Sequence, residues 1–230
     1  MHTLTHYRLC PRSRSVRLLL GEIGLEVRLA ETRPWEYRSE LLALNPAGEL
    51  PVLVLANGTI LSGAYAISEY VAEELKRHPV DGRTVPAFPG SREERAEVRR
   101  LVDWFHGKLD REVTRDVLEE KVYRGYREGG GAPDLGVLRA VRANLRYHLS
   151  YVSYLAHQRR WLAGDDMSFA DLAAAAHLST LDYLSEVPWN SYEPAKTWYA
   201  RLKSRPAFRP LLADRISGTP APLHYTNLDF

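Results

Sequence analysis

The sequence predicts two domains, an α/β N-terminal domain followed by an all-α C-terminal domain. Residues 1–80 contain strand-type and helix-type segments in the order β-α-β-(α)-β-β-α, which suits a small mixed sheet with helices on both faces. Residues 91–216 show helical periodicity throughout. Between them, residues 81–90 hold two glycines and two prolines and have no periodicity, so we expect an interdomain linker there.

Composition places the chain among ordinary globular proteins, since 45% of its 230 residues are apolar and 26% are charged. A net charge of +2 gives no electrostatic reason to expect nucleic-acid binding. The first residues lack the apolar core of a signal peptide, and no segment approaches the roughly 18 consecutive apolar residues of a membrane helix. We therefore expect a cytoplasmic protein without membrane insertion.

The chain begins with a β-turn-α pattern. Residues 3–9 favour a strand that ends in a turn at Cys10-Pro11. Apolar residues then recur at helical spacing up to Ile23, with Ser13 or Ser15 as the expected N-cap and Gly24 as the stop signal.

The rest of the α/β domain adds a loop, a hairpin and a helix. Residues 26–30 favour a second strand, and residues 31–45 an irregular loop that leaves Trp35 near the surface. The turn Asn57-Gly58 between two short apolar runs predicts a β-hairpin. Helical spacing resumes at residues 67–75.

The C-terminal domain is expected to contain long antiparallel helices. Ser91 and Glu94 have the spacing of a capping box at the first helix start. Residues 129–133 break this helix, and a second apolar stripe runs over residues 135–152. Later helices are expected from Ser168, around 198–203 and around 208–212, followed by a C-terminal tail at 217–230 without helical spacing.

Several short motifs follow one another in a characteristic order: residues 13–18, Asn45-Pro46, residues 50–53, Ala66-Ile67 with Tyr70, and residues 163–165 with 168–171. Together these motifs resemble the glutathione transferase superfamily, whose fold joins a thioredoxin-like N-terminal domain to an all-α C-terminal domain. The resemblance implies a cis peptide bond before Pro51, so that the backbone of Leu50 could pair with glutathione as an added strand. Leu50 and Pro51 are therefore the expected remnant of a glutathione site.

Three residues are vestigial candidates for thiol chemistry, and none is assigned a catalytic role. Ser13 is the best-placed hydroxyl to hold a glutathione thiolate near a helix start, with helix capping as its alternative role. Tyr7 is the second hydroxyl, with core packing as its alternative. Cys10 resembles the cysteine of one-thiol glutathione enzymes, and its alternative is simple burial. Arginines that would lower the pKa of its thiol stand nearby at positions 12, 14 and 17.

The residues that would grip glutathione are missing from the third expected helix. Glutathione-binding relatives have an acidic residue or Gln followed by Ser before the Ala-Ile segment, and this chain has Gly63 and Ala64 there. Neither side chain can form a hydrogen bond, and a buried charge left unpaired is costly. Weak or absent glutathione binding is expected, so we predict no cofactor. One cysteine and eight histidines without metal-like spacing also predict no metal site.

The tail points to a partner, because three of its last six residues are large and apolar. Such a tail has reason to dock on its own domain or on another protein. Together with Gly63 and Ala64, which replace the glutathione-binding pair, this tail resembles a family of bacterial glutathione-transferase-like division proteins that bind the tubulin homologue FtsZ. The resemblance implies a non-catalytic homodimeric scaffold at the division site, linking FtsZ filaments to cell-wall synthesis. The expected partner surface comprises Tyr225, Leu228, Asp229, Phe230 and Trp35.

The alternative is an active glutathione transferase, or a one-thiol glutathione-dependent reductase, that works through Ser13 or Cys10. Glutathione would be a cofactor only in that case.

Overall fold

A computed structural model describes residues 1–77, 87–127 and 129–228. Its N-terminal part is built on a four-stranded mixed sheet with strand order β2-β1-β3-β4. The strands are β1 (His2–His6), β2 (Val27–Glu31), β3 (Val52–Val54) and β4 (Ile60–Ser62). Strand β1 is parallel to β2 and antiparallel to β3, and the hairpin β3-β4 closes at the predicted Asn57-Gly58 turn.

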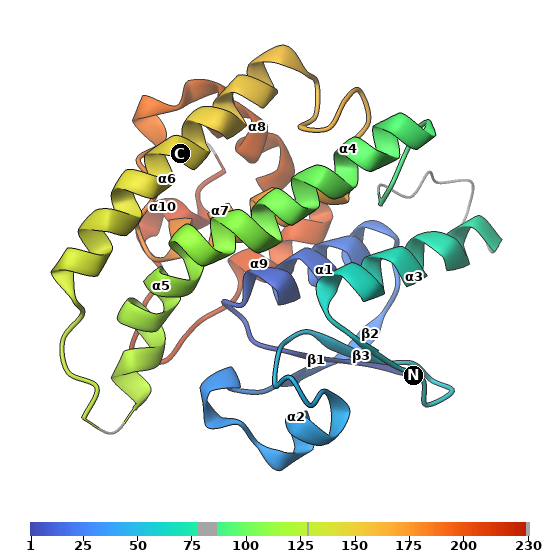
Figure 1. The fold of residues 1–230 in the computed structure, drawn as a ribbon, viewed down its shortest axis with the longest axis horizontal. Coiled ribbons are helices and arrows are strands. Elements are labelled where there is room, and N and C mark those ends of the chain that lie inside the picture. The colour runs from blue at the N-terminus through green and yellow to red at the C-terminus, as the bar shows by residue number, and fades with distance from the viewer. Residues whose placement is uncertain (78–86, 128, 229–230) are drawn as a thin grey trace.

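Helices cover both faces of this sheet. Helices α1 (Pro11–Glu22) and α3 (Ala64–Arg77) lie between the sheet and the helical part of the molecule, and α2 (Ser39–Leu44) lies on the opposite side (Figure 1). The 3-10 turn η1 (Pro34–Glu36) precedes α2. The α/β architecture predicted for this part of the chain is therefore confirmed.

The start of α1 differs from the prediction. Cys10 occupies the N-cap position and Pro11 the first helical position, so Ser13 and Ser15 lie inside the first turns rather than at the cap. The fixed φ of proline suits the first helical residue, and this preference outweighs the capping preference of a later serine. The predicted stop is correct, because Gly24 follows the helix with a φ of +70°.

The first long helix of the C-terminal part changes character along its length. It starts as α4 (Arg92–Asp103), and both hydrogen bonds of the predicted capping box are present. It continues as the π-helix η2 (Trp104–Thr114) and then as short segments up to Tyr126. These segments are α5 (Arg115–Leu118), η3 (Glu119–Tyr123) and η4 (Arg124–Tyr126). π-Helical turns are rare and often occur at functional sites.

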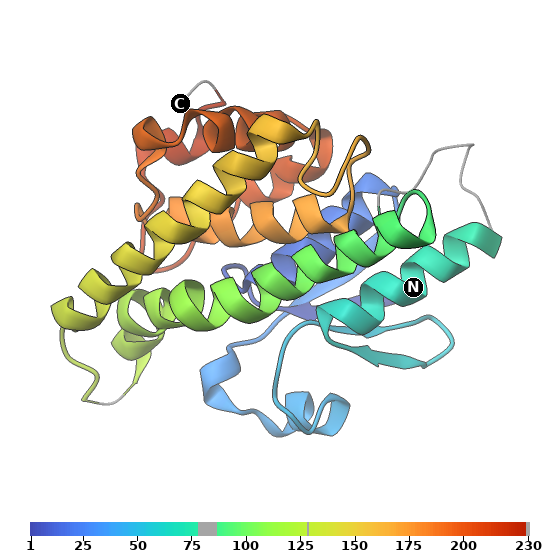
Figure 2. The same ribbon diagram turned by 45° about the horizontal axis from the view of Figure 1, so that its top comes forward.

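The remaining helices surround a central one. Helix α7 (Phe169–Tyr183) is buried along its whole length and packs against α1, so it joins the two parts of the molecule (Figure 2). The small side chains of the alanine run at 173–176 are fully buried and allow this close approach. The outer helices are α6 (Leu135–Gln158), α8 (Glu193–Lys203), α9 (Arg209–Leu212) and α10 (Leu223–Thr226), with 3-10 turns at η5 (Trp189–Ser191) and η6 (Pro206–Phe208).

The C-terminal tail is more ordered than its sequence suggested. An isolated bridge joins Ile216 to Thr219, and α10 follows in a stretch that was expected to contain no helix. Tertiary contacts stabilise this single helical turn, which is too short to have a periodicity of its own. Asp229 and Phe230 lie outside the described residues, as does most of the expected linker, residues 81–86. Within the described ranges, no helix combines the length and apolar character needed to cross a membrane.

Candidate functional site

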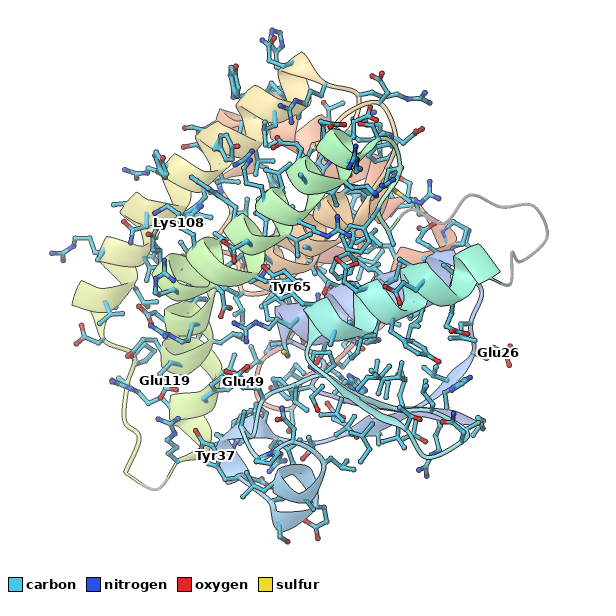
Figure 3. All side chains as sticks on the ribbon, turned by 45° about the vertical axis from the view of Figure 1, so that its right-hand side comes forward. Glu26, Tyr37, Glu49, Tyr65, Lys108 and Glu119 are labelled. Carbon is cyan, nitrogen blue, oxygen red and sulfur yellow. The ribbon has the colours of Figure 1, made fainter. Side chains whose placement is uncertain are left out.

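A cleft of about 330 Å³ lies where the start of α1 faces η2, α5 and η3. The loop before Pro51 forms one wall, and Figure 3 shows Glu49 and Tyr37 of the N-terminal part facing Glu119 of the helical part. The Leu50-Pro51 peptide bond is cis, as the resemblance implied. The side chain of Cys10 points towards this bend, with its Sγ atom 4.0 Å from the carbonyl oxygen of Leu50. The cis bend that the resemblance implied is therefore present at the wall of this cleft.

The thiol of Cys10 is poorly activated. Cys10 lines the cleft, yet burial raises the pKa of its thiol. Hydrogen bonds from Ser13 and the charge of Arg12 lower this pKa by a smaller amount. The other two nearby arginines, Arg14 and Arg17, are paired with Asp214 instead. A thiol that stays protonated near neutral pH is a weak nucleophile.

The two hydroxyl candidates are both buried beneath the cleft. Ser13 is fully buried and accepts a hydrogen bond of 3.5 Å from the backbone N–H of Tyr7, so its oxygen is already engaged. Tyr7 is 3% exposed, and burial raises the pKa of its phenol, which therefore stays protonated. Neither side chain lines the cleft around Cys10.

Trp35 joins the two parts of the molecule through aromatic contacts. Its ring stacks on Tyr126 at a centroid distance of 5.1 Å and lies 4.7 Å from Tyr123, both in the helical part. Tyr7 meets the same indole edge-on at 5.1 Å. Trp35 is half-buried here rather than freely exposed. No local signal along the chain indicated this cluster, because its members lie far apart in the sequence.

Arg12 forms a second link across the cleft. Its guanidinium donates to Glu49 at 3.0 Å, to Asp110 at 3.3 Å and to the carbonyl of His106 at 3.1 Å. Burial raises the pKa of Asp110, and the charge of Arg12 opposes that rise. The guanidinium thus ties the loop before Pro51 to the π-helix η2, a role that the sequence did not reveal.

The two positions at which the sequence predicted the missing γ-glutamyl contacts, Gly63 and Ala64, carry no polar side chain. Gly63 has a φ of +89°, and Ala64 is buried at the start of α3. The next residue, Tyr65, donates its phenolic hydrogen to Asp103 at 3.3 Å. None of these three residues lines the cleft around Cys10.

Tyr225 anchors the C-terminal tail to the protein and is not part of an exposed surface. This side chain was expected on the partner surface, but it is wholly buried. Its hydroxyl accepts a hydrogen bond from Nη1 of Arg14 at 2.9 Å and donates to the carbonyl of Leu211 at 3.1 Å. The tail therefore docks on its own chain, one of the two outcomes that the sequence predicted. Of the expected surface residues, Leu228 is 41% exposed.

Two further groups of buried polar side chains link neighbouring helices, and the first of them joins α1 to η2 and α7. The rings of His106 and His177 share a hydrogen bond of 3.1 Å, and the chain continues to Ser15 at 3.1 Å and Thr114 at 2.9 Å. Burial lowers the pKa of His106 to about 3 and that of His177 well below its usual range, so both rings are neutral. Among the described residues, no group of three or more His, Cys, Asp or Glu side chains is arranged to hold a metal ion.

The other buried group lies beneath the tail. Asp182 accepts hydrogen bonds from the indole of Trp189 at 2.8 Å, and its Oδ1 lies 3.1 Å from Nε2 of His224. Lys203 donates to the carbonyl of His224 at 3.2 Å. These contacts add polar anchors to the one that Tyr225 provides.

Family models and known proteins match this chain over most of its length. The model of the glutathione S-transferase N-terminal domain matches residues 4–79, and that of the C-terminal domain matches residues 134–206. FtsZ-localized protein A from Caulobacter vibrioides is 47% identical over 231 residues, which cover 99% of this chain and 98% of that protein. Glutathione S-transferase 2 from Saccharomyces cerevisiae is 26% identical over 217 residues, which cover 89% of this chain and 87% of that protein.

Solved structures agree with the sequence matches. A glutathione S-transferase from Sinorhizobium meliloti superposes with a TM-score of 0.94 at 48% identity, and the match covers 100% of both chains. FzlA from C. crescentus superposes with a TM-score of 0.90 at 46% identity, covering 100% of this chain and 99% of that one. The chain therefore belongs to the glutathione S-transferase superfamily, in which FtsZ-localized protein A is one of its relatives.

Proposed function

We propose that this chain is a non-catalytic scaffold that binds FtsZ filaments and regulates bacterial cell division and cell-wall synthesis, working in the cytoplasm at the division site. The observation that carries the proposal is the 47% identity, over nearly the whole of both chains, to a protein named for its localization with FtsZ. A likeness that extends from the first strand to the tail supports a shared binding surface as well as a shared fold.

The chemistry of the cleft supports a role without catalysis. An active transferase needs a group that holds the glutathione sulfur as a thiolate. Here Ser13 is fully buried, and burial raises the pKa of the Cys10 thiol. Gly63 and Ala64 offer no side chain to a γ-glutamyl group.

The anchored tail supports a preorganised partner surface. Tyr225 and the contacts of His224 hold α10 against the protein, and Leu228 follows with an exposed side chain. A segment that is already ordered loses less conformational entropy when a partner binds. We infer that Leu228, Asp229 and Phe230 contact FtsZ, with Trp35 as a further candidate.

Co-sedimentation with FtsZ polymers tests this surface. Leu228→Arg and Asp229→Lys are expected to remove most of the protein from the polymer pellet, because each places an unfavourable charge in the inferred contact. Leu135→Arg is the matched control, since Leu135 is an exposed leucine at the start of α6, on a different element. Pelleting equal to wild type in both tail variants contradicts the assigned surface, and no pelleting of the wild-type protein contradicts FtsZ binding itself.

The enzymatic alternative has a separate test. Retention on glutathione resin and conjugation of a chromogenic electrophile are expected to be absent or very weak. Saturable turnover that disappears in Ser13→Ala or Cys10→Ala would replace the scaffold proposal with an active transferase or one-thiol reductase.

We also infer that the working unit is a homodimer, because two copies of one site can crosslink neighbouring filaments. We place the second copy against an aromatic surface formed by η2 and α6. On this surface the ring of Trp104 lies 4.6 Å from the ring of Tyr151 and 6.1 Å from that of the exposed Tyr147. Light scattering coupled to size exclusion is expected to give twice the 26.2 kDa mass of the chain. Tyr147→Glu should lower the measured mass towards that of a monomer, whereas Leu223→Glu on the tail should leave it unchanged. A monomeric wild-type protein contradicts the inference of a homodimer.

A further inference from the structure

The C-terminal tail covers a pair of opposite charges that are completely buried. The side chains of Asp182 on α7 and Lys203 on α8 have no exposed surface, and the Lys203 ammonium lies 3.8 Å from Oδ2 of Asp182. Full burial of a charged side chain is rare and costs hydration free energy. The segment that keeps water from this pair therefore works against that cost.

The tail contacts both charges through a single residue, His224. Its carbonyl oxygen accepts a hydrogen bond of 3.2 Å from Lys203, and its Nε2 atom lies 3.1 Å from Oδ1 of Asp182. The side chain of His224 is 42% exposed, so its ring lies between the buried carboxylate and water. Lifting the turn α10 off the protein would remove both contacts together and admit water to both charges.

The ion pair is poorly compensated while the tail is docked. Oδ2 of Asp182 accepts no hydrogen bond in the part of the chain that the structure describes, and at 3.8 Å the ammonium lies beyond hydrogen-bond distance. Trp189 and His224 both contact Oδ1 instead. Burial raises the pKa of Asp182 and lowers that of Lys203 to about 8, so the charged form of each group is disfavoured here. A buried pair recovers its lost hydration only when its geometry is excellent and its other hydrogen bonds are made.

The tail depends on the surface beneath it for its structure. Helix α10 is a single turn of four residues, and an isolated turn of this length is unstable in water. The contacts that favour docking include the hydrogen bonds of the Tyr225 hydroxyl and the one that Tyr183 donates to the carbonyl of Thr219 at 2.8 Å. Docking is thus a balance between these contacts and the dehydration of two charges.

We propose that the Asp182–Lys203 pair is a release device for the C-terminal tail. The docked tail of the structure exchanges with a lifted state in which both charges are hydrated. Because Leu228 follows α10 directly, this balance sets the fraction of the protein that presents Leu228 in its docked position. That consequence rests on the proposed function, whereas the exchange itself is a property of this chain alone.

Hydrogen exchange of the tail amides, followed by mass spectrometry on the full chain, tests the proposal. Asp182→Asn/Lys203→Met removes both charges and keeps the oxygen that Trp189 and His224 contact, so the docked state should gain. Exchange over residues 217–228 is expected to be at least about tenfold slower than in wild type, or about 1.4 kcal/mol, within the range of gains when buried pairs are replaced. Exchange as fast as in wild type, or faster, overturns the proposal.

The single variant Lys203→Met should have the opposite effect. It leaves the Asp182 carboxylate beneath the tail without its cation, so tail exchange should become at least about tenfold faster than in wild type. If the pair simply stabilised the docked tail, the double variant would exchange as fast as this single variant, because both lose the same contact. Equal rates in the two variants contradict the proposal.

The exposed pair of Glu69 and Arg99, joined at 2.6 Å between α3 and α4, provides the matched control. Glu69→Gln/Arg99→Met removes the same two charges at the surface and should leave tail exchange unchanged. Slowing equal to that of Asp182→Asn/Lys203→Met would show a general effect of charge removal and overturn the assignment.

Co-sedimentation with FtsZ separates this proposal from the proposed function. A wild-type protein that does not pellet with FtsZ, while the variants show the expected exchange rates, contradicts the proposed function alone. A wild-type protein that pellets, while the variants lack these rates, contradicts the release device alone.

Discussion

The hydroxyl of Tyr225, near the C-terminus, accepts a 2.9 Å hydrogen bond from Nη1 of Arg14 on the first helix. Both side chains are completely buried, and the same guanidinium also donates to the carbonyl of Arg8 at 2.6 Å and to Ser179 at 2.8 Å. The end of the chain is therefore fastened to the α/β part of the molecule. Any surface that the tail presents depends on this contact.

Tyr225→Phe should weaken the attachment of the tail. The substitution removes one of two donors from the carbonyl of Leu211, which keeps the N–H of Asp214, and removes one acceptor from a buried cation, at a cost of about 1–3 kcal/mol. Urea denaturation should show the lower free energy of unfolding, and limited proteolysis should cut the tail faster. Tyr154→Phe, on an exposed tyrosine, is the control and should change neither. Identical protease sensitivity in Tyr225→Phe and wild type contradicts the anchoring role.

The thiol of Cys10 should react slowly with alkylating reagents at neutral pH. Because burial raises its pKa, the reactive thiolate should form only at a pH above the ordinary cysteine value. The rate of iodoacetamide labelling, followed from pH 7 to 10, should rise with a midpoint above that of free glutathione. Cys10 is the single cysteine, so Cys10→Ala gives the blank. A midpoint below that of glutathione would restore Cys10 as a candidate nucleophile.

Local signals predicted much of the fold. The Asn57-Gly58 turn, the stop at Gly24 and the capping box at Ser91 each depend on residues a few positions apart, and all three are present in the structure. The start of α1 differs from the prediction, because Pro11 is the first helical residue and the serines expected as caps lie inside the first turns.

The site could be predicted only in outline. The bend at Leu50-Pro51 follows from a motif, whereas the Arg12 link joins positions 12, 49 and 110. The stacking of Trp35 on Tyr126 likewise spans both parts of the molecule. Such contacts depend on how the two parts pack, and periodicity along the chain carries no information about them.

Arg12→Ala should loosen the junction between the loop before Pro51 and η2. Asp110 lies largely buried and would lose the one cation that the described contacts place at hydrogen-bond distance, and the carbonyl of His106 would lose the hydrogen bond from Arg12. We expect a loss of about 1–3 kcal/mol in the free energy of unfolding. Arg28→Ala is the matched control, because the exposed Arg28 is bonded only to Thr3 in the described contacts. A loss no larger than that of Arg28→Ala contradicts the bridging role of Arg12.

The buried histidine pair should make the protein sensitive to acid. In the folded state burial holds the pKa of His106 near 3, whereas the unfolded chain has the ordinary value of 6.5. The folded protein therefore binds fewer protons below pH 6.5, so its stability is full above that pH and falls as the pH drops towards 3. Each such histidine should cost about 1.4 kcal/mol per pH unit in this range.

Urea unfolding at pH 7, 6 and 5 measures this slope, and substitution of the pair identifies its source. His106→Gln keeps a polar side chain next to Ser15 and His177 but removes one titrating group, so its stability should depend less steeply on pH. His157→Gln, at an exposed position near the end of α6, should keep the wild-type slope. Because His6, with a pKa lowered to about 4 by burial, titrates in the same range, part of the slope should persist in His106→Gln. A slope identical to wild type in His106→Gln would show that its ring does not resist protonation, and the neutral Ser15-His106-His177-Thr114 chain would have to be abandoned.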